Sequence, residues 1–263
     1  MSSRGLGDVY KRQVFKSENV WAGLPLGVAG TYEEFCERNR MDAFLRERVN
    51  SWSNLAFVWF GLIALLNGIR PKQVLSKNHL VQKNGILSVF TGLSFLYLGI
   101  GSFLYHAALT KYTQLLDVAG TYAALVAVIA VALITLITPY LSKAKNYKKI
   151  LIAVVLVCAL IADILLFKYK WEIDSAVVLP VMIVLLIMLS MAIHLSKKHK
   201  AQPILAILSF IAVATAFLIW NLDVKKIFCN PDSLLQGHAI WHILTGTGLF
   251  LMYLFCWKVE VLE

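Results

Sequence analysis

Long apolar runs alternate with short polar connections along most of this 263-residue chain. A helix of roughly 20 apolar residues crosses the hydrocarbon core of a bilayer. The runs of this length are 52–69, 87–107, 114–138, 150–167, 175–195, 203–220 and 237–257. None of them shows the two-residue alternation of a membrane β-barrel. The pattern therefore predicts an all-α membrane protein, built as a bundle of seven transmembrane helices.

The same pattern divides the chain into four parts. Residues 51–258 are expected to form the seven-helix domain, and residues 259–263 a short tail. Residues 14–50 form a polar segment, without the apolar run that a signal peptide carries. Residues 1–13 resemble translated adapter sequence, and we expect them to be a non-native leader.

Composition strengthens the membrane prediction. Hydrophobic residues make up 59% of the chain and charged residues only 15%, against about 25% charged residues in typical soluble domains. The net charge of +10 is compatible with nucleic-acid binding, but the basic residues lie in short clusters between apolar runs rather than on one face. We therefore expect the bilayer and a membrane lipid as partners, and no nucleic acid. No feature of the sequence predicts an oligomeric state.

The basic residues are distributed unequally between the two sides of the predicted bundle. The connections on the N-terminal side carry Lys111, Lys168, Lys170, Lys225 and Lys226. The opposite connections and the C-terminal tail carry Arg70, Lys72, Lys77, Lys83, Lys143, Lys145, Lys148, Lys149, Lys197, Lys198, Lys200 and Lys258. Positively charged connections remain in the cytoplasm. This predicts an N-terminus outside, in the periplasm or lumen, and a cytoplasmic C-terminus, in a bacterial inner membrane or an endoplasmic reticulum or Golgi membrane.

Four ionisable residues are expected at similar depth near the non-cytoplasmic face. His106 ends the second run, Asp117 begins the third, and His238 and His242 open the seventh. Ionisable side chains at membrane depth are costly and indicate function. The paired histidines are one helical turn apart and suit a single metal ion, with His106 as a third ligand. Three histidines and an open position are typical of catalytic Zn²⁺, which activates water to attack a carbonyl; a lone membrane histidine more often hydrogen-bonds a neighbouring helix.

Ser102 and Asp117 are the expected catalytic partners of this cluster. Ser102 precedes His106 by one helical turn, so its hydroxyl can hydrogen-bond the metal-bound water or the oxyanion. The alternative is a small residue that permits helix packing, beside Gly99 and Gly101. Asp117 can move a proton of the water or orient a ligand.

The polar N-terminal segment is rich in oxygen-bearing side chains. Glu33, Glu34, Glu37, Asn39, Asp42 and Glu47 lie within fifteen residues. Such hard ligands suit Ca²⁺, although the interleaved arginines equally favour a solvated, salt-bridged surface. Cys36 and Cys229 both fall on the predicted outer side, where an oxidising compartment permits a disulfide.

Taken together, the motifs resemble the alkaline ceramidase family, part of a superfamily of membrane hydrolases that includes the adiponectin-receptor-like proteins. The motifs are E-x-x-N-x-x-S-N at 47–54, S-x-x-x-H at 102–106, Asp117 and H-x-x-x-H at 238–242. The resemblance covers roughly residues 31–256 and implies an intramembrane zinc amidase that cleaves ceramide to a sphingoid base and a fatty acid. It implies zinc ligands at His106, His238 and His242, with Ser102 and Asp117 contacting the zinc-bound water. It implies a calcium site at Glu34, the backbone carbonyl of Phe35, Glu37, Asn39 and Glu47.

The chain departs from the family pattern next to the first span. The family usually has Asp-Trp-Cys-Glu where this chain has Glu-Phe-Cys-Glu, and the stretch between Asn39 and Glu47 is one residue shorter. Three other functions remain open from the sequence. These are hydrolysis of another acyl lipid, a seven-helix receptor or transporter without hydrolase activity, and a scaffold with a structural zinc site.

Overall fold

A computed structural model describes residues 20–69, 78–141 and 145–262. The expected leader at 1–13 lies outside these residues, as do four of the basic residues counted on the predicted cytoplasmic side, Arg70, Lys72, Lys77 and Lys143. The described part of the chain is mostly helical, with two strands of two residues each, and contains seven spans that are long and apolar enough to cross a membrane. The prediction of an all-α, seven-helix membrane protein is therefore confirmed.

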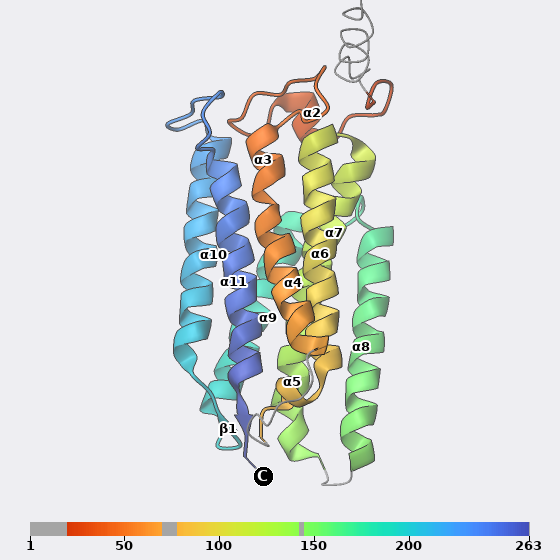
Figure 1. Ribbon diagram of the computed structural model, residues 1–263, viewed down its shortest axis with the longest axis vertical. Helices are drawn as coiled ribbons and strands as arrows, with labels where there is room; N and C mark the ends of the chain where they lie inside the picture. The colour runs from red at the N-terminus through yellow and green to blue at the C-terminus, as the bar shows by residue number, and fades with distance from the viewer. Residues whose placement is uncertain (1–19, 70–77, 142–144, 263) are drawn as a thin grey trace, which may run out of the picture.

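The spans follow one another up and down the long axis of the molecule (Figure 1). They are α3 (Arg48–Ser53) continued by α4 (Leu55–Ile69), α6 (Gly85–Ala108), α7 (Lys111–Ile137), α8 (Lys145–Lys168), α9 (Ser175–Leu195), α10 (Pro203–Val224) and α11 (Gly237–Lys258). The short elements are α2 (Val28–Tyr32), α5 (Leu80–Lys83), the 3-10 turn η1 (Thr138–Tyr140), β1 (His199–Lys200) and β2 (Glu260–Val261). The first span begins at Arg48, slightly before the expected domain boundary at 51.

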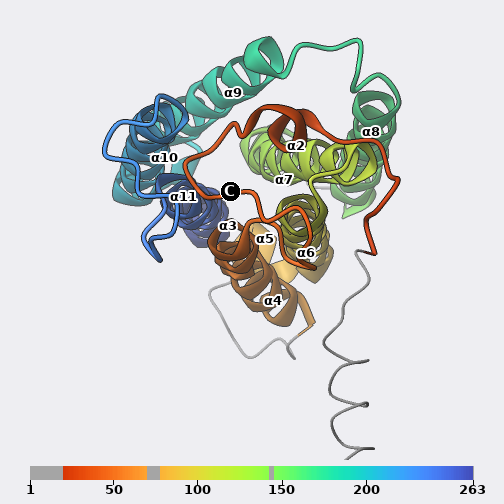
Figure 2. The ribbon, with the colours of Figure 1, turned by 90° about the horizontal axis from the view of Figure 1, so that it is seen from above.

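Helix α7 lies inside the bundle, with α6, α8, α9 and α11 around it (Figure 2). In the most apolar stretch of α7, about two thirds of the residues (67%) are buried, against 11% in that of α8. Alanine dominates its buried positions, and small side chains allow membrane helices to approach closely. The poorly buried helices such as α8 present their side chains outward, as lipid-facing helices do.

Glycines set the close contact between α4 and α6. A Cβ atom on Gly92 would lie 2.7 Å from the backbone nitrogen of Leu65, and one on Gly61 would lie 2.9 Å from the Gly92 carbonyl oxygen. Neither position therefore accepts a larger residue without moving a helix. This contact fixes α6 against the first span, and so places the C-terminal end of α6, with His106, beside α3.

The N-terminal segment, residues 20–47, crosses the end of the bundle where α6 ends and α7 begins (Figure 2). It caps the C-terminus of α6, whose last carbonyl groups have no partner within the helix. The carbonyl oxygens of His106 and Ala107 accept hydrogen bonds from the backbone N–H groups of Glu47 and Arg46 at 3.0 and 3.1 Å. A disulfide with an S–S distance of 2.11 Å joins Cys36 of this segment to Cys229, in the connection before α11.

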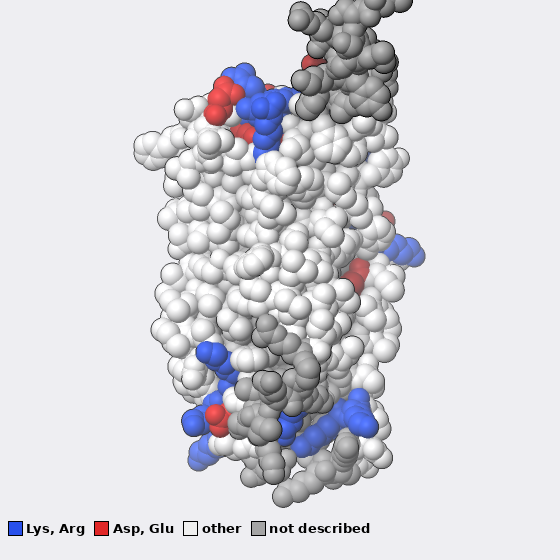
Figure 3. Space-filling model, viewed as in Figure 1, with Lys and Arg blue, Asp and Glu red and all other residues white. Residues whose placement is uncertain are grey.

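Most charged side chains gather at the two ends of the molecule, and the band between them is largely apolar on the face shown in Figure 3, apart from a few charged side chains on one flank. At the end opposite the N-terminal segment, β1 and β2 form a two-stranded antiparallel sheet in which His199 pairs with Val261. This sheet ties the chain after α11 to the connection between α9 and α10. The polar ends and the apolar band together match a bilayer-spanning molecule.

Candidate metal centre

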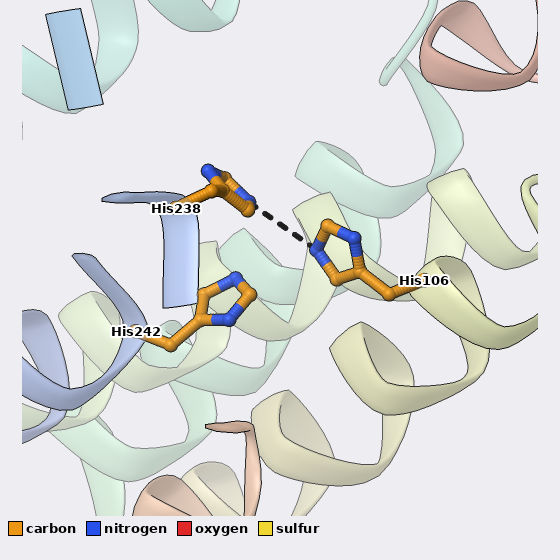
Figure 4. A group of neighbouring side chains, drawn as sticks. All are labelled: His106, His238 and His242. Atoms are coloured by element: carbon orange, nitrogen blue, oxygen red, sulfur yellow. Dashed lines mark hydrogen bonds between the residues drawn. The ribbon is translucent and has the colours of Figure 1, made fainter. Parts of the chain in front are cut away.

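Three histidine rings converge near the end of the bundle that carries the N-terminal segment, one from α6 and two from α11 (Figure 4). His106 Nε2 and His238 Nε2 are 3.3 Å apart, and one ligand nitrogen from each of His106, His238 and His242 lies within 4.8 Å of the other two. All three side chains are buried, with at most 5% of their surface exposed. Within residues 20–69, 78–141 and 145–262, this is the one group of at least three His, Cys, Asp or Glu side chains close enough to hold a metal ion.

Two oxygen atoms orient two of these rings. Glu47 Oε2 lies 2.5 Å from His106 Nδ1. Ser53 Oγ lies 2.7 Å from His242 Nδ1 and donates its single proton to the Asn50 carbonyl at 2.8 Å. Ser53 Oγ therefore accepts the bond from His242. With each Nδ1 donating outward, each Nε2 keeps a lone pair for a metal ion, which is the usual arrangement around metal-binding histidines.

The third ring, His238, contacts His106 through its Nε2 atom and is also held by stacking. The ring of Phe35, from the N-terminal segment, stacks on His238 with centroids 3.6 Å apart and an interplanar angle of 19°. The Nδ1 atom of His238 is buried and has no hydrogen-bond partner. The resemblance assigned a role to the Phe35 carbonyl, whereas in the structure its ring covers one side of the histidine cluster.

Ser102 and Asp117 lie together beside the cluster. The Ser102 hydroxyl hydrogen-bonds the Asp117 carboxylate, which also interacts electrostatically with His106. Ser102 is buried and Asp117 half-buried. Helices α6 and α7 approach each other closely beside Ser102, because a Cβ atom on Gly101 would lie 2.7 Å from the Leu116 carbonyl oxygen. Because Gly101 has no side chain, α6 approaches α7 closely, and the Ser102 hydroxyl reaches the Asp117 carboxylate on α7.

The oxygen-rich part of the N-terminal segment is arranged differently. Both carboxylate oxygens of Glu37 accept backbone hydrogen bonds, from Val49 at 3.0 Å and Asn50 at 2.8 Å. These N–H groups belong to the first turn of α3, whose donors need external partners. Burial raises the pKa of Glu37, although these two hydrogen bonds oppose the shift. Arg40 also approaches Glu37 at 3.4 Å, so the carboxylate already has protein partners.

Two other members of the oxygen set retain free acceptors. Asn39 Oδ1 and Glu47 Oε1 are buried and have no hydrogen-bond partner. The same holds for Asn50 Oδ1, which is close to them in sequence. Buried polar atoms without partners are rare and call for a missing ligand or water. Burial raises the pKa of Glu34, and the negative charge of Glu47 adds to this shift. The unpartnered acceptor oxygens and the raised pKa of Glu34 are both consistent with a cation-binding site.

One observation opposes a cation at the Phe35 carbonyl. The Lys226 ammonium, from the connection before α11, donates hydrogen bonds to the carbonyl oxygens of Glu33 and Phe35. Lys226 therefore supplies a positive charge next to the set of oxygens that the resemblance assigned to calcium.

From the sequence, Ser53 was expected only to hydrogen-bond inside the bundle, Lys226 counted only toward the charge asymmetry, and Glu47 belonged only to the oxygen set. The E-x-x-N-x-x-S-N motif contains Glu47 and Ser53, so their importance was signalled by the motif. Their pairing with particular histidines depends on how α3 packs against α6 and α11. Lys226 carried no signal beyond its positive charge.

The fold and this cluster define a class: a seven-span membrane protein with a buried three-histidine centre and an adjacent Ser–Asp pair. The family model described as Ceramidase matches residues 30–263, nearly the whole chain. The chain therefore belongs to the Ceramidase family. Membership implies a membrane hydrolase that acts on amide bonds of a lipid. A search among curated proteins gave no match.

Proposed function

We propose that this protein is a zinc-dependent amidase that hydrolyses the N-acyl bond of ceramide-like sphingolipids, releasing a sphingoid base and a free fatty acid. The observation that carries the proposal is the convergence of three buried histidine rings beside a Ser–Asp pair. Family membership supplies the amide-bond chemistry and the lipid class. Three nitrogen ligands suit Zn²⁺, and a bound zinc ion would act as a Lewis acid toward the amide carbonyl and lower the pKa of water at its open position.

Metal binding, ring orientation and proton transfer are assigned to different side chains. His106, His238 and His242 hold the ion, and Glu47 and Ser53 fix the orientation of two of the rings. With an ion held by the three histidines, the Asp117 carboxylate would take a proton from the attacking water and return it to the leaving amide nitrogen, as a general base and then a general acid. The Ser102 hydroxyl, which hydrogen-bonds Asp117, keeps that carboxylate in place.

We further propose that the N-terminal segment binds Ca²⁺ in a structural or regulatory role, through Glu34, the Phe35 carbonyl, Glu37, Asn39 and Glu47. The free, buried oxygens of Asn39 and Glu47 support this proposal. Binding at the Phe35 carbonyl would require the Lys226 ammonium to move away from it. Glu47 would then connect the two metal sites, since its other oxygen contacts His106.

The proposed orientation places the N-terminus and the histidine cluster at the non-cytoplasmic side. The disulfide between Cys36 and Cys229 supports it, because Cys36 follows Phe35, whose ring stacks on His238 of the cluster, and disulfides persist in oxidising compartments. The basic residues at the opposite end, among them Lys197 and Lys198, agree with a cytoplasmic location.

The test is metal analysis combined with a lipid-hydrolysis panel on the detergent-purified protein. We expect about one zinc per chain and release of fatty acid from ceramide. Chelation should stop turnover, and added Zn²⁺ should restore it. Turnover restricted to another acyl lipid would correct the substrate but keep the reaction class. Zinc binding without hydrolysis of any lipid amide or ester would refute the proposed activity.

A further inference from the structure

The connection between α10 and α11, residues 225–236, carries three apolar side chains that are almost fully exposed. Phe228, Leu234 and Leu235 are exposed at 96%, 88% and 75% of their surface. A single exposed apolar residue is ordinary, but several on one short connection mark a binding surface. Figures 1 and 2 show this connection at the edge of the bundle, projecting outward beside α10 and α11, whereas the N-terminal segment crosses over the helices. The partner of these side chains therefore lies at the side of the molecule.

Hydrogen bonds within the connection hold the two leucines in place. The buried Gln236 side chain donates to the carbonyl oxygens of Asn230 and Ser233, at 3.0 and 2.7 Å. The backbone N–H of Leu235 donates to Ser233 Oγ at 2.9 Å. The exposed leucines thus stand on a hydrogen-bonded turn, and their exposure is a property of the folded chain.

The backbone that carries Phe228 is strained. The φ angles of Lys226 and Phe228 are 56° and 60°, in the left-handed region that bulky side chains rarely adopt. Two contacts tie this stretch to the N-terminal segment: the Lys226 ammonium donates to the Phe35 carbonyl, and Cys229 forms the disulfide with Cys36. Strained residues persist where the surrounding structure determines them, and they collect at binding sites. Strain and nearly complete exposure together indicate that Phe228 is presented to a partner.

The neighbouring surface identifies this partner as lipid. Helix α10 leads directly into the connection, and only 17% of its most apolar stretch is buried. Leu218, six residues before the end of α10, is exposed at 62% of its surface. A lipid-facing surface therefore continues from α10 into the connection, where the exposed Lys225 adds a positive charge. Phenylalanine and leucine beside lysine are typical of segments that lie at the boundary between headgroups and acyl chains.

A protein partner fits this surface less well. An aromatic side chain buries about 150–250 Å², so three apolar side chains fall short of the roughly 800 Å² that each partner gives to a stable protein interface. A lipid leaflet sets no such minimum, because the spans already hold the protein in the bilayer. The acidic residue of the connection does not oppose insertion, since Asp232 is paired with Arg38 of the N-terminal segment at 2.7 Å.

We propose that the α10–α11 connection is an interfacial anchor, whose Phe228, Leu234 and Leu235 side chains enter the lipid leaflet beside α10. The inference needs only the membrane-spanning fold and does not rest on the proposed hydrolase activity. Because the disulfide joins the connection to the N-terminal segment, the anchor also holds that segment, which covers the histidine cluster, at the membrane surface.

The test places an environment-sensitive fluorophore at residue 234. Leu234→Cys is made in a Cys158→Ser background, because Cys158 is an exposed free thiol, and is labelled with bimane. The protein is reconstituted in phosphatidylcholine nanodiscs, with and without nitroxide-labelled phosphatidylcholine. We expect emission at shorter wavelength than in water, strong quenching by the nitroxide lipid, and loss of most of the quenching by aqueous iodide. Leu218→Cys is the lipid-facing reference, and Asp42→Cys, at an exposed position of the N-terminal segment, is the aqueous reference.

Two results would overturn the inference. Iodide quenching as strong as that of Asp42→Cys, without quenching by the nitroxide lipid, would place residue 234 in water. Shielding from both quenchers would mean that protein covers the connection, as in an association of two copies of the chain. If Leu234→Cys does not fold, Leu235→Cys carries the same comparison.

Discussion

The histidine cluster and the oxygen set of the N-terminal segment lie at the same end of the molecule but are built on different supports. The histidines project from α6 and α11, and two of them are oriented by single hydrogen bonds, leaving their ligand nitrogens free. The oxygen set lies on irregular backbone between α2 and α3. There, Glu37 already bonds the first turn of α3, and the Phe35 carbonyl bonds the Lys226 ammonium.

This difference shows what a rigid helix contributes to a metal site. On a helix, residues four apart share one face whatever the rest of the molecule does, so the ligands are placed before any ion binds. On an irregular segment, a cation competes with protein donors for the oxygens, as at Glu37 and the Phe35 carbonyl. Glu47 belongs to both sites, because one of its oxygens contacts His106 and the other has no partner. Mutations should therefore affect the two sites unequally.

The largest effect is expected from His238→Ala. It removes one of three nitrogen ligands, and the two that remain do not form the three-ligand site of a catalytic zinc. We expect both bound zinc and lipid hydrolysis to fall to background, measured by metal analysis and fatty-acid release. His194→Ala is the control, since His194 is exposed on α9 outside the cluster. Full turnover by a metal-free His238→Ala protein would refute the zinc mechanism.

Glu47→Gln is expected to have the next largest effect, because it keeps the shape of the side chain but removes the charge beside His106. Losing such an outer partner typically costs about 10-fold to 100-fold in metal affinity or activity. Ser53→Ala tests the equivalent neutral partner of His242 and should cost less, since hydrogen bonds to charged groups are the stronger ones. Competition with a chelator measures zinc affinity in both variants. Equal affinity in Glu47→Gln and the wild type would show that this contact does not orient His106.

Much of the fold was predictable because membrane-spanning helices can be recognised in a sequence by their length and hydropathy. The seven spans, the common depth of His106, His238 and His242, and the position of Ser102 one turn from His106 follow from helical geometry. These features depend only on spacing within a helix and on the direction in which each span runs. The close approach of α6 and α7 at Gly101 completes the Ser–Asp pair.

The contacts of the N-terminal segment could not be predicted in the same way. That Glu47 bonds His106, that Phe35 stacks on His238, and that Lys226 reaches the Phe35 carbonyl depend on how the segment crosses the bundle. Its path follows from the unpaired carbonyls at the end of α6 and from the disulfide to Cys229. No periodicity within residues 20–47 encodes those tertiary partners.

Asn39→Ala tests the second site without touching the first. If Asn39 Oδ1 binds calcium, CaCl₂ should stabilise the wild type, by about 2.7 kcal/mol at a hundred times the dissociation constant. The variant should lose most of this response while keeping its zinc. Thermal unfolding in detergent with and without CaCl₂ is the measurement, and Asp42→Asn, an exposed acidic change in the same segment, is the control. If the thermal unfolding midpoint of the wild type does not change with CaCl₂, the calcium proposal is refuted. The Lys226 ammonium would then be the cation of this region.

The smallest effect is expected from Asp232→Asn, in the connection between α10 and α11 that contacts the N-terminal segment. Asp232 accepts two hydrogen bonds from Arg38, at 2.7 and 2.9 Å, and one from Arg40 at 3.1 Å. The hydrogen bonds from Arg38 hold the pKa of Asp232 below its usual range, which for aspartate is about 3.9. The stabilisation is therefore complete above that value and is lost as the pH falls through the lowered pKa.

Because Asp232 and Arg38 are both exposed at 57% of their side-chain surface, salt should screen the pair strongly. We expect the variant to unfold at a slightly lower temperature than the wild type at neutral pH and low salt. The two midpoints should converge in high salt or at a pH below the lowered pKa. A large, salt-independent loss would mean that these arginines position the N-terminal segment over the histidine cluster together with the disulfide. In that case calcium-independent contacts, and not an ion, would hold the segment on the active site.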